Sequence, residues 1–166
     1  YDTKEILNKI FVSLDKIKPS NLIIVGDLLH DVFSTLSIKD QDYKNLSQYS
    51  KNTDFIWIKG NHDENIQIAG FKNLTNYKID KFLFTHIPIK TSLFQICGHY
   101  HPKVKISHRG KTIFKTCFVH NEKIFILPSF GILTGGLDIH SKQISDVLGK
   151  NNLSIYPVGQ DKVYKL

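Results

Sequence analysis

Four short blocks rich in Asp, Asn and His fall in order along the chain, and each lies where an expected β-strand gives way to a loop. The blocks are residues 26–30 (GDLLH), 60–63 (GNHD), 85–88 (THIP) and 98–101 (GHYH). At strand ends, side chains from distant parts of a chain can converge on an ion without leaving buried charge unpaired. The order and placement of the blocks therefore predict a metal site.

The residue types in these blocks suit a pair of divalent ions. Asp27, at the end of an expected strand, supplies an anionic oxygen that can bridge two ions, whereas imidazoles and the Asn61 carbonyl add ligands without adding charge. His99 and His101 are two residues apart, so in an extended segment they would point to opposite faces. Both can bind metal only if Gly98 opens a turn beneath them.

The second block also offers a proton donor. Gly60 is expected to turn the backbone sharply, so that Asn61 and His62 face the site. Because Asp63 follows directly, the His62 imidazole should stay protonated more readily and can protonate a leaving alkoxide. Two metals ~3.5–4 Å apart would hold a bridging hydroxide for in-line attack on phosphorus. The reaction that these parts fit is phosphoester hydrolysis.

Each residue has a simpler interpretation when it is taken alone. Asp27 could cap a turn, His86 could be a structural histidine, and the Gly60–Asn61 pair could be an ordinary turn. His30 and Asp31 are expected to be loop residues around the site rather than ligands. The joint order of the four blocks is what favours the metal site.

The first half of the chain has the pattern of a layered α/β fold. Apolar residues at helical spacing predict a helix over 2–18, and a weaker pattern predicts another over 40–50. Continuous apolar runs at 21–25 and 55–58 predict buried parallel strands that lead into the first two blocks. A strand normally precedes the first helix of such a sheet, so we expect the domain to lack an N-terminal strand.

After residue 70 the pattern changes to sheet. Strands are expected over 73–79, 81–85, 94–98, 104–107, 112–119 and 124–127, with turns at 109–111 and 120–122. A glycine-rich loop at 129–136 is expected to be flexible or to allow close approach, and a short helix at 142–148 and a hairpin at 153–166 complete the chain. The length of 166 residues and 41% hydrophobic content predict a single domain over 1–166.

Composition restricts the setting. The net charge of +7 comes from dispersed lysines, which favours a solvated lysine surface over a polyanion groove, although either would attract a phosphate substrate. Cys97 and Cys117 are too few for a disulfide framework and lack the spacing of a zinc site. No apolar run reaches the ~20 residues of a membrane span. We therefore expect a cytoplasmic protein that does not bind membranes.

At the four blocks the chain resembles the calcineurin-like metallophosphoesterases, whose motifs read GD, GNH(D/E), a lone His and GHxH. This resemblance implies a four-layer αββα sandwich and two divalent ions, Mn²⁺ or alternatively Fe or Zn²⁺. It implies that Asp27 bridges the ions, that His101 binds one of them, and that His62 and Asp63 lie near the leaving group. The other ion would be bound by Asn61, His86 and His99.

A narrower resemblance rests on residues 98–102, 117–131 and 134–136. These segments are similar to the bacterial ligase-associated metallophosphoesterases, small single-domain proteins of nucleic-acid repair or processing. The resemblance implies a nucleotide or nucleic-acid substrate and a DNA ligase or helicase as partner.

One motif of the family is missing. The family opens with an Asp-x-His block, and none precedes Gly26, so Asp27 and His101 alone would hold the second ion. Two protein ligands bind a divalent ion weakly, and we expect one tight metal and impaired activity. The leading hypothesis is an N-terminally incomplete, metal-dependent phosphomono- or phosphodiesterase. The alternative is a degenerate phosphoesterase that serves as a metal-containing binding module for nucleic acid or protein.

Overall fold

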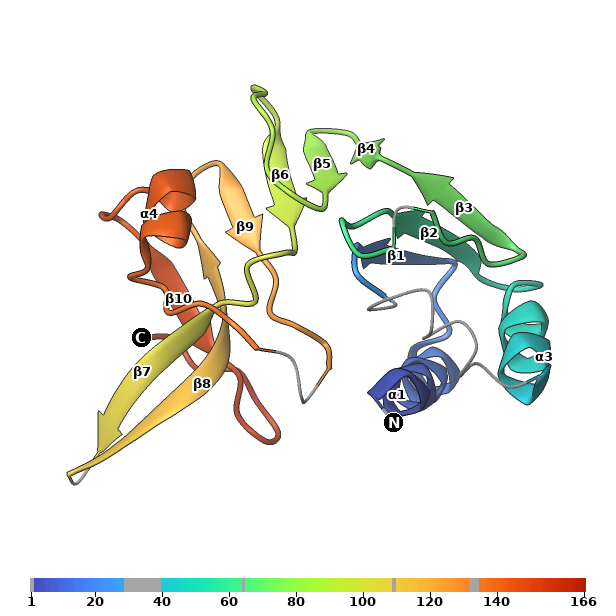
Figure 1. Cartoon of the computed structure of the whole chain (residues 1–166), viewed down its shortest axis with the longest axis horizontal. Helices are drawn as coiled ribbons and strands as arrows, with labels where there is room; N and C mark the ends of the chain where they lie inside the picture. Colours follow the sequence, from blue (N-terminus) through green and yellow to red (C-terminus); the bar gives the residue numbers. More distant parts are fainter. Residues whose placement is uncertain (1, 29–39, 64, 109, 132–134) are drawn as a thin grey trace. The chain divides into compact units, whose positions relative to one another are not determined.

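The computed structural model describes residues 2–28, 40–63, 65–108, 110–131 and 135–166 (Figure 1). The chain divides into two compact units, Tyr1–Tyr77 and Lys78–Leu166, here called unit 1 and unit 2. Helices and sheets occur together, which confirms the predicted α/β class. The expectation of a single domain over 1–166 stays a prediction. In the described part of the chain, no helix is long and apolar enough to cross a membrane.

Unit 1 is built around a parallel sheet. Its helices are α1 (Asp2–Ile17) and α3 (Asp40–Tyr49), and its strands β1 (Asn21–Val25), β2 (Asp54–Ile58) and β3 (Phe71–Leu74) lie in the order β1-β2-β3. The register aligns Val25 with Ile58, so β1 and β2 end side by side. The first polar block begins directly after β1 and the second begins after Lys59, which follows β2, so both blocks come after strands, as the sequence predicted.

The two helices of unit 1 pack on the sheet through their apolar faces. In α1 the residues Leu7, Ile10 and Leu14 are buried at helical spacing, and they join a core cluster with Phe55 and Trp57 of β2. Four of the five β2 residues are buried, as expected of a strand in a parallel sheet that is covered on both faces. This packing fixes the strand ends that carry the site.

Unit 2 is dominated by sheet. Its elements are β5 (Phe82–Thr85), β6 (Phe94–Cys97), β7 (Lys103–His108), β8 (Lys111–His120), β9 (Ile124–Ile126), α4 (Lys142–Leu148) and β10 (Ser154–Pro157), and β4 (Asn76–Ile79) spans the boundary between the units. The strand order is β10-β8-β9-β6-β5-β4, with β7 paired to β8. Strands β5 and β6 are parallel, with Thr85 opposite Cys97, so the third and fourth blocks also emerge side by side.

Two predicted strands differ from the structure. The strand expected over 73–79 is two strands: β3 joins the sheet of unit 1 and β4 the sheet of unit 2, with Thr75 between them. An alternating pattern shows where a chain is extended but not which neighbour it pairs with. In the hairpin expected over 153–166 only β10 is a strand, followed by an isolated antiparallel bridge between Val158 and Val163.

The two cysteines are buried, free thiols. Burial raises the pKa of Cys97 and of Cys117 to about 12. Both therefore remain protonated at neutral pH, which makes them poor nucleophiles and poor metal ligands.

Candidate metal centre

Unit 1 holds Asp27 in an unusual backbone conformation. Gly26 and Asp27 follow β1 with φ angles of 81° and 46°, in the left-handed region that non-glycine residues rarely adopt. The Asp27 Oδ1 accepts a hydrogen bond from the His62 backbone N–H at 3.1 Å. The loops after β1 and β2 are thus joined directly at a predicted ligand.

Gly60 is required for a different reason from the one expected. Its φ is not positive, so no left-handed turn demands glycine at this position. A Cβ at Gly60, however, would come within 2.5 Å of the Asp27 backbone N and still closer to Asp27 Oδ1. Glycine therefore lets the two loops approach each other, which the sequence did not reveal because the contact joins residues far apart in the chain.

Asp63 holds the loop that carries Asn61 and His62. Its carboxylate is fully buried. Oδ1 accepts the Gly60 N–H at 2.7 Å, and Oδ2 accepts the Leu28 N–H at 2.9 Å and the Trp57 Nε1–H at 3.1 Å. Desolvation by burial raises the pKa of Asp63, while the hydrogen bonds from Gly60 and Leu28 oppose that rise. These bonds give Asp63 a positioning role that adjacency to His62 did not suggest; its predicted role beside the leaving group stays a prediction.

Lys59 is a further residue at this site that the sequence analysis missed. Its Nζ lies 3.6 Å from the centroid of the Trp57 ring and donates a hydrogen bond to the Asp63 backbone oxygen at 3.1 Å. Desolvation lowers the pKa of Lys59, and the charge of Asp63 counteracts this. A lysine before a polar block carries no sequence signal, because its role depends on the ring beside it.

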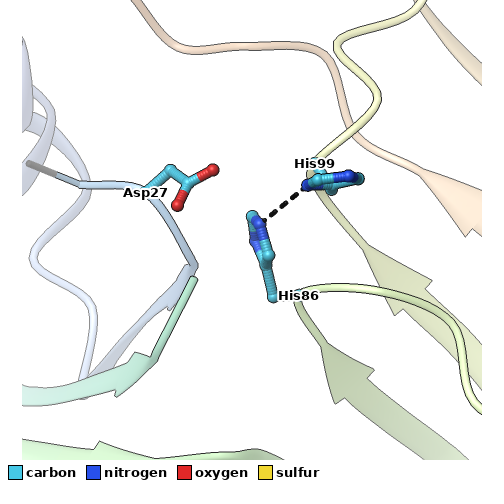
Figure 2. A group of neighbouring side chains, drawn as sticks. All are labelled: Asp27, His86 and His99. Carbon is cyan, nitrogen blue, oxygen red and sulfur yellow. Dashed lines mark hydrogen bonds between the residues drawn. The ribbon is translucent and has the colours of Figure 1, made fainter. Parts of the chain in front are cut away.

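Unit 2 brings two predicted histidine ligands together. His86 follows β5 and is 5% exposed, and His99 follows β6. The His99 Nδ1 and the His86 Nε2 are 3.1 Å apart, as the dashed line in Figure 2 shows. Their rings are nearly perpendicular, with centroids 5.0 Å apart. Two imidazoles arranged in this way present nitrogen atoms to the same point, as ligands of one ion must.

The turn that presents His99 is made by the histidine itself. His99 has a φ of 66°, and the Tyr100 N–H donates to the Gly98 oxygen at 2.8 Å, which closes a γ-turn centred on His99. His101 is also left-handed, with a φ of 45°. The turn begins at Gly98, as expected, but the φ of Gly98 is not positive, so the positive φ falls on the histidines. The histidines themselves turn the backbone.

Left-handed backbone is concentrated at predicted ligands. Among the residues that the structure describes, six non-glycine residues have positive φ, and three of them are Asp27, His99 and His101. Each such residue costs about 1–3 kcal/mol and persists only where its surroundings enforce it. Strain of this kind is typical of functional sites.

The remaining predicted residues are placed as follows. Asn61 and His62 are exposed in the loop after β2, and His101 is partly buried before β7. A Cβ at Gly136 would clash with the His101 backbone oxygen, which confirms the close approach expected of that loop. His30 and Asp31 lie outside the described residues.

Comparisons with known proteins identify the family and the fold of the chain. A family model described as "Calcineurin-like phosphoesterase" matches residues 1–155. A search of curated proteins found no match. Among solved structures, the crystal structure of the Pseudomonas putida nuclease MPE is similar, with a TM-score of 0.75 and 25% sequence identity over 99% of this chain and 78% of that one. The fold is therefore the metallophosphoesterase fold predicted from the sequence motifs.

Proposed function

The chain belongs to the calcineurin-like phosphoesterase family, and from this membership we propose that it hydrolyses phosphomono- or phosphodiesters of nucleotides or nucleic acid. The similarity to the Pseudomonas putida nuclease MPE supports this class of substrate. Membership of the family implies divalent metal ions, and the ligand types of the four blocks fit them. Carboxylate, amide and imidazole groups together suit Mn²⁺, Fe or Zn²⁺, and we propose Mn²⁺.

From the order of the family's motifs we propose that Asp27, His86 and His99 bind the same ion. Asn61 would complete this set, and His101 would bind a second ion together with Asp27. Divalent ions in such a site supply Lewis-acid polarisation of a phosphoryl oxygen. The pair of histidines supports this proposal most directly. His86 and His99 follow two neighbouring parallel strands, and their ring nitrogens are 3.1 Å apart.

The chain's own residues account for proton transfer. His62 is exposed, so its ring can reach a substrate, and its backbone N–H is fixed on Asp27. We propose that the imidazole donates a proton to the oxygen of the leaving group, which avoids release of an alkoxide. Asp63 and Lys59 hold the loop from which His62 extends, through the hydrogen bonds of Asp63 with Gly60 and of Lys59 with the Asp63 backbone oxygen.

The test uses the full-length protein with Mn²⁺ and bis-p-nitrophenyl phosphate. Asn61→Ala and His99→Ala should lose both Mn²⁺ affinity, measured by calorimetry, and hydrolysis. His62→Ala should keep Mn²⁺ and lose rate, most strongly for poor leaving groups. His140→Ala, a change at an exposed histidine that we do not assign to the site, is the matched control.

Two results would overturn these assignments. If Asn61→Ala and His99→Ala hydrolyse the substrate as fast as the control, the metal site is wrong. If His62→Ala loses Mn²⁺ to the same extent as His99→Ala, His62 is a ligand and not an acid. The impaired activity expected from the missing Asp-x-His block is measured in the same assay. The ligase-associated subfamily, a ligase or helicase partner and the cytoplasmic location stay predictions.

A further inference from the structure

The β7–β8 hairpin is the most basic segment of unit 2. Its two antiparallel strands pair from Lys103 with Thr116 to His108 with Lys111. Figure 1 shows the two strands running side by side. Residues 103–120 contain four lysines and Arg109 but no aspartate or glutamate, so much of the chain's net charge of +7 lies here. The dispersed surface charge expected from the sequence is therefore locally concentrated.

The lysines of the hairpin are available to a ligand. Lys105, Lys111 and Lys115 are exposed. The two ion pairs found between described residues, Lys9 with Glu5 and Lys72 with Asp54, involve none of them. A positive segment without acidic neighbours in the same hairpin attracts polyanions.

An aromatic side chain stands among these charges. Phe114 is 57% exposed and lies directly across the hairpin from Lys105, on the same face. The next pair along that face is Ser107 and Thr112, whose hydroxyl oxygens are 3.1 Å apart. Phe114 does not belong to the hydrophobic core, to which β8 contributes its buried residues Cys117 and Val119. An exposed ring between a lysine and a pair of hydroxyls suits the face of a nucleic-acid base.

We propose that the β7–β8 hairpin binds single-stranded nucleic acid, with a base stacked on Phe114 and a phosphate bound by Lys105 on the same face. Lys111 and Lys115 alternate to the opposite face and add to the positive potential around the bound strand. A single strand is chosen over a duplex because stacking on a side chain requires a base whose face is open. This binding goes beyond the proposed hydrolysis, since it requires no bond to break.

The position of the hairpin connects it to the metal ligands within unit 2. Strand β7 begins at Lys103, two residues after His101. Its six residues extend about 20 Å. A strand bound along the hairpin would therefore begin next to a predicted ligand, where a phosphodiester could be presented for hydrolysis.

The test measures the affinity of a fluorescein-labelled dT12 by anisotropy at several NaCl concentrations. The background is His62→Ala with Mn²⁺, so that the oligonucleotide stays intact. Phe114→Leu should weaken binding about 5- to 150-fold, the range produced by losing one base stack, whereas Phe114→Trp should stay within about 2-fold. Lys105→Gln should reduce the slope of log K against log salt by about 0.7. Lys78→Gln, the same charge change at an exposed lysine of β4, is the control and should leave the slope unchanged.

The outcomes separate this proposal from the proposed function. Contacts with phosphate are strong at a NaCl concentration of about 50 mM, so the hairpin proposal is wrong if dT12 does not bind there. The proposal is also wrong if Phe114→Leu binds dT12 as tightly as Phe114→Trp. It is also wrong if Phe114→Leu changes only self-association in sedimentation, because the face would then contact a second copy of the chain. The phosphoesterase is tested separately. For this test the hairpin variants are made in protein that keeps His62, and their hydrolysis of bis-p-nitrophenyl phosphate is measured. Normal dT12 binding without hydrolysis would support the hairpin and overturn the proposed function.

Discussion

Replacing Asp63 with asparagine tests whether this carboxylate holds the loops that carry the ligands. Three N–H groups, from Leu28, Trp57 and Gly60, point at its two oxygens within 2.7–3.1 Å. Asparagine has one acceptor oxygen. If that oxygen takes the place of Oδ2, the new amide NH₂ faces the Gly60 N–H, and a buried donor loses its partner.

The magnitude follows from two opposing effects. An unpaired buried N–H costs about 1–3 kcal/mol. Asparagine also removes a buried charge. Because burial raises the pKa of Asp63, the charged form is unfavourable in the folded state, and its removal offsets part of the loss in the free energy of unfolding. We expect a net loss of about 1–2 kcal/mol in the free energy of unfolding, which lowers Tm by roughly 2–8 °C in a chain of this length. Since the loops position Asp27 and Asn61, Mn²⁺ affinity should fall about 10- to 100-fold.

The assay compares Asp63→Asn with Asp54→Asn. Asp54 lies in the same unit, and its exposed ion pair with Lys72 is worth no more than about 1 kcal/mol. Thermal denaturation gives Tm, and calorimetry gives the affinity for Mn²⁺. Asp63→Glu, which keeps both oxygens, should recover part of the metal affinity. Our reasoning is refuted if Asp63→Asn matches Asp54→Asn in both Tm and Mn²⁺ affinity.

Two further predictions concern packing and ionisation. Gly60→Ala should lower the free energy of unfolding by about 1–3 kcal/mol and weaken Mn²⁺ binding, because the new Cβ would lie 2.5 Å from the backbone N of Asp27. An unchanged melting curve and an unchanged binding isotherm would contradict this prediction. Cys97 and Cys117 should resist iodoacetamide at pH 8 until urea unfolds the chain, which mass spectrometry would show, and equal labelling without urea would exclude burial. Because their pKa is raised to about 12 from 9.0, their contribution to stability is complete below pH 9 and lost as the pH rises toward 12.

Local pattern was sufficient for most helices and strands. The spacing of Leu7, Ile10 and Leu14 predicted α1, and the apolar runs predicted β1 and β2 as parallel strands that end at the polar blocks. These predictions succeed because helical periodicity and burial on both faces leave their mark within a few residues. The pairing of β3 and β4 with different sheets leaves no such mark.

The sequence by itself determined the residue types of the metal site and their positions after strands. Tertiary structure alone decided how they are held: the buried Asp63 carboxylate accepts hydrogen bonds from Gly60 and from Leu28, which is 35 residues from Asp63, and Gly60 must lack a Cβ because Asp27 lies against it. It also decided that His99, rather than Gly98, takes the left-handed turn. The reason is physical: side-chain type and periodicity are local properties, whereas hydrogen bonds and steric contacts between loops depend on the register of the strands beneath them.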